Sequence, residues 1–530
     1  MTTNNWGIPN EAGLEQLANS LFPDLDAYRC AGGIERLVTA GDTSVIYEAA
    51  QKAENYYGSF GGGYLSEYEK LADELMNETA GTGTAEAASA QTAGYSPSVL
   101  SESQAADYIP RTAANSAAPV SASTDTVVGT KTLSQIRADF PILSEVINGH
   151  PLVWLDNGAT TQRPQAVIDR LSYYYTHENS NVHRGAHELA ARSTDAYENA
   201  RQITADFIGA PDKNNIVFVR GTTEAINLVA NAYVKPLLKP GDEIILSILE
   251  HHANIVPWQL VCEETGAVIK VIPCDESGQL IMSEYEKLFT RKTRFVSVTQ
   301  VSNVLGTVTP VAELIAVAHE HGVPVLVDGA QSVAHIPVNV SALDADFFVF
   351  SGHKIFAPTG IGALYGKKEL LEAARPYHGG GNMIKDVTFE RTIYNPAPNK
   401  FEAGTGSIAD AVGLGAALGY LGSIGMPAVN KHEHDLLVYG MSELKKINGL
   451  HLIGTASDKA SVLSFILDGH SNEEVGARLN ELGIAVRTGH HCAQPVLRRF
   501  GLEGTVRPTL ALYNSFEDID ALVKGIRSLA

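Results

Sequence analysis

Residues 347–365 read FFVFSGHKIFAPTGIGALY, and this stretch decides the fold. The apolar run 347–350 has the length and composition of a strand buried on both faces. It ends in the sequence SGHK at 351–354, and a second apolar stretch begins near Ile361. A lysine just past a buried strand can lie in a desolvated pocket, where its pKa falls and its free amine can form a Schiff base. On these residues alone, Lys354 is equally well interpreted as an exposed lysine at a strand end.

Similar apolar runs recur from Leu133 onward and alternate with amphipathic helical stretches such as Ala312–His321. The predicted strands are Ile216–Val219, Ile244–Leu246, Val268–Ile272, Phe295–Val298, Val323–Val327 and Phe347–Phe350. This alternation predicts an α/β fold in which helices cover both faces of a mostly parallel sheet. After about residue 418 the pattern becomes rich in helices, which predicts a second, smaller domain. Ligands of such sheets bind beyond the carboxyl ends of the strands.

Polar side chains follow several of these strands at that end. They are Thr222, Thr223, His251, Asn303, Asp328, Gln331, Ser351 and His353. Threonines at a helix N-terminus can seat a phosphate, and a histidine can lie over a flat cofactor. A buried carboxylate at 328 needs a cationic partner, which the pyridinium nitrogen of pyridoxal phosphate would supply. Each residue alone also fits a helix cap or a structural role, but the ordered set predicts a pyridoxal phosphate site.

The sequence RTGHHCAQP at 487–495 places a thiol beside two histidines and an arginine. Such surroundings stabilise a thiolate. A buried structural cysteine is one alternative, and a metal site made by His490, His491 and Cys492 is another. Adjacent residues of a strand point to opposite faces and chelate poorly, so we predict no metal site. Further along, Arg507 could clamp a substrate carboxylate through two parallel hydrogen bonds, or it could form a salt bridge at the rim.

Seven segments together resemble the SUF-type (group II) cysteine desulfurases of the class V aminotransferase family. They are RGTTEAINLVAN, EHHANIVPWQ, VSNVLGT, LVDGAQS, FSGHK, FEAGT and RTGHHCAQP. The resemblance covers the chain from about residue 131 to 530. It implies pyridoxal-phosphate fold type I, which is the fold of aspartate aminotransferase. It also implies a large cofactor-binding domain over 145–418 and a small α+β domain, built from 131–144 and 419–530, that carries the catalytic cysteine.

The resemblance assigns roles to individual residues. Those expected to hold the cofactor are Lys354 as the Schiff-base lysine, Asp328 at the pyridinium, Gln331 and Asn303 at the ring oxygen, His251 on the ring face, Thr222, Thr223, Ser351 and His353 at the phosphate, and Thr405 at the phosphate of the neighbouring subunit. Those expected to bind the substrate, L-cysteine, are Arg507, Asn303, His183 and Arg487. Cys492, Lys354 and His251 are the expected catalytic residues. The contact from Thr405 implies a homodimer.

The implied reaction removes sulfur from L-cysteine, releases L-alanine and leaves a persulfide on Cys492. The sulfur would serve iron–sulfur cluster assembly or storage, with a sulfur-acceptor protein as a further partner. The compact loop around Cys492 resembles the SUF branch rather than the ISC branch, in which the cysteine lies on a longer mobile loop. The alternatives are a selenocysteine lyase and a non-catalytic scaffold associated with a protein shell.

The first 130 residues differ in composition from the rest of the chain. They contain 5 Lys and Arg residues against 17 Asp and Glu residues, and so supply −12 of the net charge of −21. Short leucine and aromatic islands in 1–78 predict helical docking segments, although a small helical domain is the alternative. The Ala/Ser/Thr-rich stretch 79–130 predicts a disordered linker. This extension resembles the targeting region of desulfurases packaged in encapsulin shells, which implies such a shell as a partner.

Composition also limits the location and partners of the protein. The negative net charge argues against nucleic acid or an anionic membrane as a partner. No apolar stretch is long enough to cross a bilayer, and the start of the chain lacks the features of a signal peptide. The 4 cysteines form no CxxC pair, which fits a reducing compartment. We therefore expect a cytoplasmic protein, enclosed in an encapsulin nanocompartment.

Overall fold

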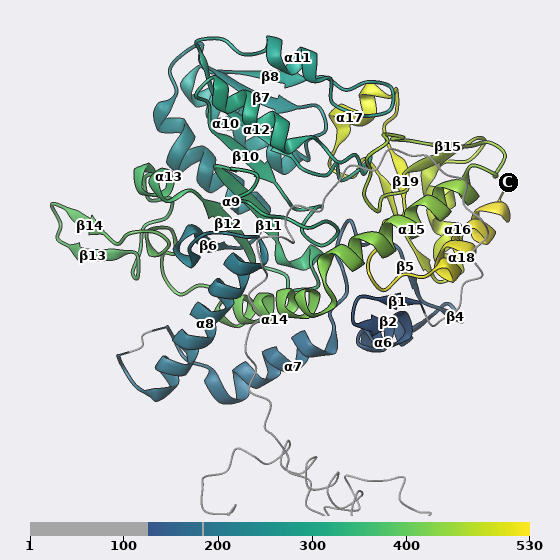
Figure 1. The fold of residues 1–530 in the computed structure, drawn as a ribbon, viewed down its shortest axis with the longest axis horizontal. Coiled ribbons are helices and arrows are strands. Elements are labelled where there is room, and N and C mark those ends of the chain that lie inside the picture. Colours follow the sequence, from purple (N-terminus) through teal and green to yellow (C-terminus); the bar gives the residue numbers. More distant parts are fainter. Residues whose placement is uncertain (1–125, 183–184, 530) are drawn as a thin grey trace, which may run out of the picture. The chain divides into compact units, whose positions relative to one another are not determined.

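The structure, a computed structural model, describes residues 126–182 and 185–529 (Figure 1). All of these residues belong to one unit, Ser98–Ala530. The docking segments predicted in 1–78, most of the predicted linker 79–130, and His183 lie outside the described residues.

A seven-stranded sheet forms the centre of the fold, with strand order β6-β12-β11-β10-β9-β7-β8. Its strands are β6 (Ile216–Val219), β7 (Glu243–Ser247), β8 (Val268–Ile272), β9 (Thr293–Thr299), β10 (Val325–Asp328), β11 (Phe347–Ser351) and β12 (Gly362–Gly366). Only β12 runs against its two neighbours, and the other pairs are parallel. The predicted strands and the mostly parallel sheet are confirmed, because long buried runs of Val, Ile and Phe fit a strand covered on both faces.

Successive residues of most strands enter two different hydrophobic cores, whereas Val268 and Val271 of the edge strand β8 are exposed. Ile216 and Phe218 of β6 pack on one face, whereas Val217 and Val219 pack on the other. The first face is covered by α7 (Gln165–Tyr173), α8 (Glu188–Phe207), α12 (Val311–Glu320) and α14 (Ile408–Ile424). The second is covered by α9 (Thr222–Leu228), α10 (Val256–Thr265) and α13 (Lys368–Ala373). Helices therefore cover both faces, and the ends of the strands remain available for a site.

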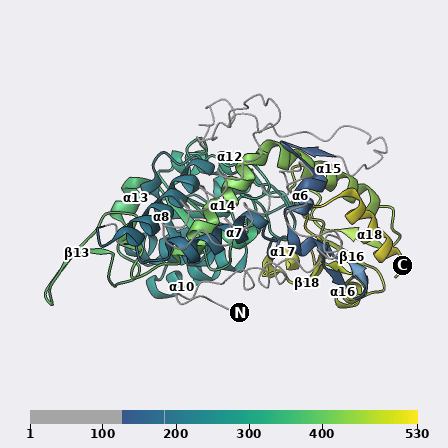
Figure 2. The same cartoon turned by 90° about the horizontal axis from the view of Figure 1, so that it is seen from below.

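A second, antiparallel sheet follows in the sequence, with order β15-β16-β19-β18. Its elements are β15 (Leu450–Leu452), β16 (Phe465–Leu467), β18 (Arg487–Gly489) and β19 (Thr505–Arg507), which pack with α15 (Met426–Leu444), α16 (Asn472–Glu481) and α18 (Phe516–Arg527). The short helix α17 (Gln494–Arg499) lies between β18 and β19 in sequence. The sheet and helices α15, α16 and α18 form their own core, at the opposite end of the molecule from β13 in both views (Figures 1 and 2). The exact domain boundaries at 145 and 418 stay a prediction.

Short strands connect the start of the described chain to the rest. They are β1 (Val127–Val128), β2 (Lys131–Thr132), β3 (Val146–Ile147), β4 (His150–Pro151) and β5 (Val153–Trp154), the last of which pairs in parallel with β17 (Ile484–Ala485). Helix α6 (Leu133–Ala138) begins with a capping box between Thr132 and Gln135. The predicted linker boundary at residue 130 is wrong, because Val128 is buried and β1 pairs with β2.

Two remaining features lie apart from the strand ends. A hairpin of β13 (Ile384–Val387) and β14 (Thr392–Tyr394) extends away from the described body (Figures 1 and 2). Helix α11 (Met282–Lys287) follows β8 in the sequence. In the described part of the chain no single helix is long and apolar enough to cross a membrane; α14 and α15 meet that test only as a pair bent by 76°.

Candidate active site

The carboxyl ends of five parallel strands surround one cavity of about 320 Å³. Its lining includes Thr222, Thr223, His251, Asn303, Asp328, Gln331, Ser351, His353, Lys354, Arg487, Cys492 and Arg507. Each of these was predicted from the sequence as a site residue. The structure also adds Gly158, Ala159, Ala253, Thr299, Val301, Ala330 and His491 to the lining. Residues from β18, β19 and the loop before α17 therefore face the residues at the ends of the large sheet.

Lys354 ends the single 3-10 turn η8 (Gly352–Lys354), which directly follows β11. Burial of the amine lowers the pKa of Lys354 to about 8, and the positive charge of Arg507 acts in the same direction. The carboxylates of Asp328 and Asp156 and the thiol of Cys492 oppose that shift. Near neutral pH a larger fraction of this lysine is therefore a free amine than of an ordinary lysine, which favours Schiff-base formation.

Asp328 is the last residue of β10, and its side chain is only 3% exposed. Burial raises the pKa of Asp328, while the N–H of Ala330, 2.9 Å from Oδ1, and the charge of Lys354 oppose the increase. A carboxylate in this position gains stability from a cation placed against it. This is the environment that the sequence predicted for a group that binds a pyridinium.

His251 is the N-cap of the 3-10 turn η7 (His252–Asn254). Its Nδ1 accepts a hydrogen bond from the N–H of Ala253 at 3.0 Å. Burial, together with the charge of Lys354, lowers the pKa of His251 to about 3. The ring is therefore neutral throughout the physiological range. A neutral, partly buried imidazole in the cavity wall is suited to lie against an aromatic ring.

The four predicted phosphate-binding residues come from two strand ends. The Ser351 hydroxyl accepts a hydrogen bond from the Thr222 N–H at 2.8 Å and contacts the Thr222 hydroxyl at 2.9 Å. Gly221 lies beneath them with φ of 151°, and a Cβ there would lie 3.1 Å from Ser351 Oγ, so this position favours glycine. Burial lowers the pKa of His353 to about 4. Hydroxyls and N–H groups thus gather at this end of the cavity.

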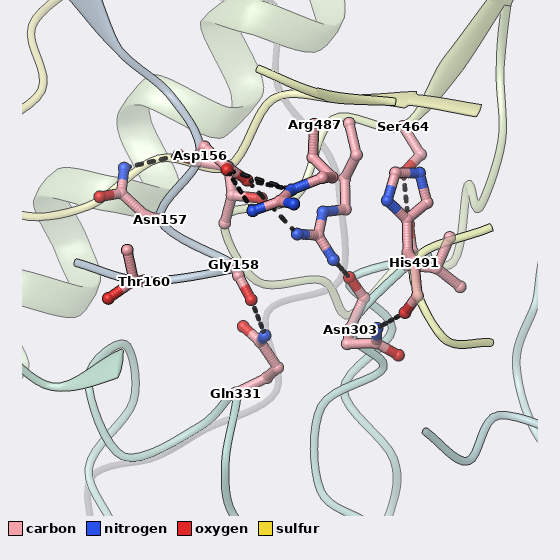
Figure 3. Close-up of polar contacts among 12 residues, drawn as sticks. Asp156, Asn157, Gly158, Thr160, Asn303, Gln331, Ser464, Arg487 and His491 are labelled. Atoms are coloured by element: carbon pink, nitrogen blue, oxygen red, sulfur yellow. Dashed lines mark hydrogen bonds and ion pairs between the residues drawn. The ribbon is translucent and has the colours of Figure 1, made fainter. Parts of the chain in front are cut away.

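Asn303 and Arg507 connect the two sheets at the site. Asn303 Nδ2 donates to the carbonyl oxygen of His491 at 2.7 Å (Figure 3). Arg507 Nη1 donates to the carbonyl oxygen of Asn303 at 2.9 Å. The predicted contact from Asn303 to a cofactor ring oxygen would have to use its second N–H, and it stays a prediction. Arg507 is 3% exposed, and burial lowers its pKa to about 10.

Sequence reasoning did not find Asp156, which lies at the centre of a charged network beside the cavity (Figure 3). Its Oδ2 accepts from Arg487 Nη2 at 2.9 Å, and its Oδ1 lies 3.7 Å from Arg507 Nη2. One carboxylate therefore fixes both predicted substrate-binding arginines. The signal was present, since LDNGATT places an acidic residue after the apolar run 152–155, but that strand is too short to be recognised by its pattern.

The residues after Asp156 connect the parts of the site. The carbonyl oxygen of Gly158 accepts from Gln331 Nε2 at 2.7 Å (Figure 3). Thr160 Oγ1 donates to the carbonyl oxygen of His353 at 2.9 Å, and the Thr161 N–H donates to the same oxygen at 3.0 Å. Segment 156–161 thus contacts the arginines, the predicted ring-binding glutamine and the backbone next to Lys354.

Two predicted residues are not placed in this cavity. Thr405 is exposed and does not line it, so its predicted contact with a neighbouring subunit stays a prediction. His183 lies outside the described residues. Among the residues that the structure describes, no three or more His, Cys, Asp or Glu side chains form a group suited to a metal ion.

The side chains fit pyridoxal phosphate. The cavity brings together a lysine with a lowered pKa, a buried carboxylate, a neutral imidazole and a cluster of hydroxyls. Among the described side chains, Asn303 Oδ1 and Arg507 Nε are buried polar atoms without a hydrogen-bond partner. Such atoms are costly unless a ligand pairs with them, and both residues line the cavity.

Comparisons with known proteins identify the family of this chain. Residues 153–522 match the family model described as aminotransferase class-V. The chain is 63% identical over 397 residues to a cysteine desulfurase of Synechococcus elongatus, covering 75% of this chain and 63% of that protein. It is 46% identical over 394 residues to a probable cysteine desulfurase of Vibrio cholerae, covering 74% of this chain and 97% of that protein. The chain thus spans less than two thirds of the Synechococcus relative and nearly all of the Vibrio one.

Solved structures of cysteine desulfurases are also similar to this chain. A crystal structure of an S-sulfonic acid form of a cysteine desulfurase from Escherichia coli has a TM-score of 0.70 and 40% identity, covering 75% of this chain and 98% of that one. An apo structure of a cysteine desulfurase from Thermococcus onnurineus has a TM-score of 0.71 and 37% identity, covering 75% of this chain and 97% of that one.

Proposed function

We propose that this chain, which belongs to the class-V aminotransferase family, is a pyridoxal-phosphate-dependent cysteine desulfurase. It would remove sulfur from L-cysteine, release L-alanine and retain the sulfur as a persulfide on Cys492. One observation carries the proposal: the amine of Lys354 and the thiol of Cys492 line the same cavity. The identity to a Vibrio cholerae protein named as a probable cysteine desulfurase, over nearly its whole length, supports it.

When bound, pyridoxal phosphate supplies an aldehyde carbon that binds amines and a ring that accepts electrons. Asp328 would hold its pyridinium nitrogen, and His251 would lie on the ring face. The phosphate would contact the residues that gather at the other strand ends, which are Thr222, Thr223, Ser351 and His353. Gln331, whose amide donates to the Gly158 carbonyl, would contact the ring oxygen.

Lys354 would then move the proton of the substrate. Because its pKa lies at about 8, the amine exchanges protons readily near neutral pH and can take one from the substrate Cα. Arg507 and Arg487 would bind the substrate carboxylate. Arg507 Nε, which is buried and has no partner among the described residues, is a free donor for that carboxylate.

Cys492 would perform the sulfur transfer. Its thiolate attacks the sulfur of the substrate, so an S–S bond forms on the enzyme while the C–S bond of the substrate breaks. The electron pair of the broken bond stays with the substrate carbon, which takes up a proton and leaves as alanine. The half-buried position of Cys492 allows the resulting persulfide to meet a second thiol from outside.

Incubation of the protein with L-cysteine tests this function by measuring alanine and sulfane sulfur in equal amounts. Removal of residues 1–125 should leave both yields unchanged if the described chain carries the activity. Replacement of L-cysteine by L-selenocysteine distinguishes a desulfurase from a selenocysteine lyase. Absence of alanine with cofactor-loaded protein would contradict the proposal, and would favour a non-catalytic scaffold.

We also propose that the active form is a homodimer. The β13–β14 hairpin carries exposed apolar side chains, among them Phe389 at its turn and Val387. An extended arm with such a surface is typical of an element that packs on a partner. Exposed Thr405 supports the same proposal, because its predicted phosphate contact needs a second subunit. Light scattering should give twice the chain mass, and Phe389→Glu should shift the protein toward monomer.

The SUF-type assignment, the shell and the location are further proposals. Only residues 490–493 separate β18 from α17, and such a compact cysteine loop supports the SUF branch. The acidic, compositionally distinct residues 1–130 support packaging within an encapsulin shell in the cytoplasm. Residues 1–130 fused to a fluorescent protein should co-purify with a co-expressed encapsulin shell. Exclusion of both the fusion and the full-length chain would contradict this.

A further inference from the structure

The loop that carries the catalytic thiol has an unusual backbone. His491 has φ of 49° and Cys492 has φ of 53°, so two successive residues with side chains adopt the left-handed region. Residues other than glycine rarely adopt this conformation, even singly. The conformation therefore persists only because neighbouring groups hold it. The groups that hold residues 490–493, here called the Cys492 loop, determine where the sulfur lies.

Contacts to His491 hold one side of this loop. Its carbonyl oxygen accepts from Asn303 Nδ2 at 2.7 Å, and its ring Nε2 lies 3.0 Å from both the carbonyl and the hydroxyl oxygen of Thr505. These contacts fix His491 to the loop after β9 and to β19. They do not constrain the N–H or the carbonyl oxygen of Cys492 itself.

Two other histidines bind Cys492 directly. The N–H of Cys492 donates to Nδ1 of His490 at 3.0 Å. The carbonyl oxygen of Cys492 accepts from the N–H of His252 at 2.8 Å. Both backbone groups of the nucleophile are thus occupied by histidine residues from different parts of the chain. Neither His490 nor His252 has a role in the reaction proposed above.

The two imidazoles also contact each other. Their ring centroids lie 5.8 Å apart with an angle of 26° between the rings. Nε2 of His252 accepts from the N–H of Gln494 at 3.4 Å, at the start of α17. Each ring therefore uses one nitrogen to accept a backbone N–H, which requires that nitrogen to carry no proton. The arrangement is consistent only with two neutral rings.

We propose that His490, supported by His252, is a positioning residue that keeps the Cys492 thiol in the cavity by accepting the N–H of Cys492 at its Nδ1. Without this acceptor the N–H of Cys492 would lose its partner in the loop. The Cys492 loop would then leave its left-handed conformation, and the thiol would move out of reach of the substrate. The catalytic consequence rests on the proposed desulfurase function, whereas the loop contacts do not.

The surroundings disfavour a proton on the ring of His252, because burial, together with the charge of His490, lowers its pKa. On the loop side, His491 is adjacent, and burial with the charges of Arg507, Arg487 and His490 lowers its pKa to about 3.

A matched pair of variants tests the proposal. His490→Asn places an accepting Oδ1 near the position of Nδ1 and does not titrate, whereas His490→Ala removes the acceptor. The first readout is the rate at which iodoacetamide alkylates Cys492 in the cofactor-loaded protein, measured on the Cys492 peptide by mass spectrometry. The second is alanine formation from L-cysteine. Peptide-level measurement separates Cys492 from the other three cysteines.

At about pH 8, where imidazoles are neutral, we expect His490→Ala to raise alkylation about fivefold and to lower kcat by a similar factor, with KM unchanged. His490→Asn should match the wild type in both readouts. The Asn variant separates the two explanations, because a loss of packing alone would affect His490→Asn as well as His490→Ala.

Two results would overturn the proposal. One is equal alkylation and equal kcat in the Ala and Asn variants at pH 8. The other is a His490→Ala variant that keeps the wild-type alkylation rate and kcat at pH 8. If His490→Ala fails to fold, His252→Ala against His252→Gln provides the same comparison, because Gln can offer an acceptor to Gln494. If alkylation behaves as expected and no variant forms alanine, the desulfurase function fails and the loop inference stands.

Discussion

The carboxylate of Asp156 lies 3.7 Å from the guanidinium of Arg507 and at the same time accepts a hydrogen bond from Arg487 at 2.9 Å. One acidic side chain thus holds two arginines, of which Arg507 is buried and Arg487 is half exposed. Without Asp156, the positive charges of Arg487 and Arg507 would repel each other, and Arg487 would be free to move into solvent. Asp156 therefore prepares the place where the substrate carboxylate binds.

Asp156→Asn should raise KM for L-cysteine about tenfold, which corresponds to about 1.4 kcal/mol of lost binding. Steady-state kinetics measures this, with kcat expected to change less. Cysteamine, which lacks the carboxylate, serves as the control: its binding to the cofactor-loaded protein should be the same in both proteins. An unchanged or lowered KM for L-cysteine would contradict the role assigned to Asp156.

Gly158→Ala tests the same place by steric means. A Cβ at this position would lie 2.9 Å from Thr509 Oγ1 and 3.0 Å from Arg507 Nη2. Because Arg507 is buried and bonded, it would have to shift, so KM should rise while the visible absorbance of the cofactor stays the same. Gly422→Ala in α14 is a suitable control for expression and folding, since a Cβ there meets open space and the residue is helical. Equal KM values in Gly158→Ala and wild type would show that Arg507 tolerates the displacement.

The pKa of Lys354 makes a prediction about pH. Only the neutral amine reacts with the aldehyde of pyridoxal phosphate, and a lowered pKa of about 8 means that the neutral fraction rises with pH and levels off just above that value. The rate of cofactor uptake by stripped protein, followed by visible absorbance, should therefore reach a plateau near pH 8 to 9. An ordinary lysine, with a pKa of 10.5, would give a rate that still rises above pH 9.5. Lys354→Ala should acquire no such absorbance.

A buried ion pair stabilises the fold near the site. Arg201 on α8 makes two hydrogen bonds to Glu402, at 2.6 and 2.9 Å, and Glu402 also accepts from the N–H of Phe218 at 2.8 Å. Arg201→Met should lower the free energy of unfolding by about 3 to 5 kcal/mol, because it leaves a carboxylate buried without its charge partner. Urea unfolding measures this. Arg192→Met on the same helix is the matched control, since that residue is exposed and its ion pair should contribute little.

Much of the fold could be predicted because its strands are apolar runs, most of which are buried. Ile216–Val219 and Val268–Ile272 form strands at the predicted residues, and the others differ at their ends. The direction of β12 and the strand Val153–Trp154 could not be predicted in this way. The latter has only two residues, and it is a strand because it pairs with Ile484–Ala485, far away in the sequence.

The same distinction applies to the site. Lys354, Asp328 and Cys492 could be predicted, because each is a reactive residue type at the end of a strand or in a glycine-containing loop. Asp156 and the His252–His490 contact could not, since their roles arise only when distant segments meet. Local sequence patterns indicate which residues lie at the end of a strand, whereas tertiary packing determines which of these residues contact one another.

The central claim is that Lys354 and Cys492 act on one substrate in one cavity. Peptide mass spectrometry after a single turnover of cofactor-loaded protein with L-cysteine tests it most directly. The account predicts one added sulfur atom on Cys492 for each alanine released, and no alanine from a Cys492→Ala variant that keeps its cofactor absorbance. Alanine formation at the wild-type rate in that variant, or sulfur added to a different cysteine, would contradict it.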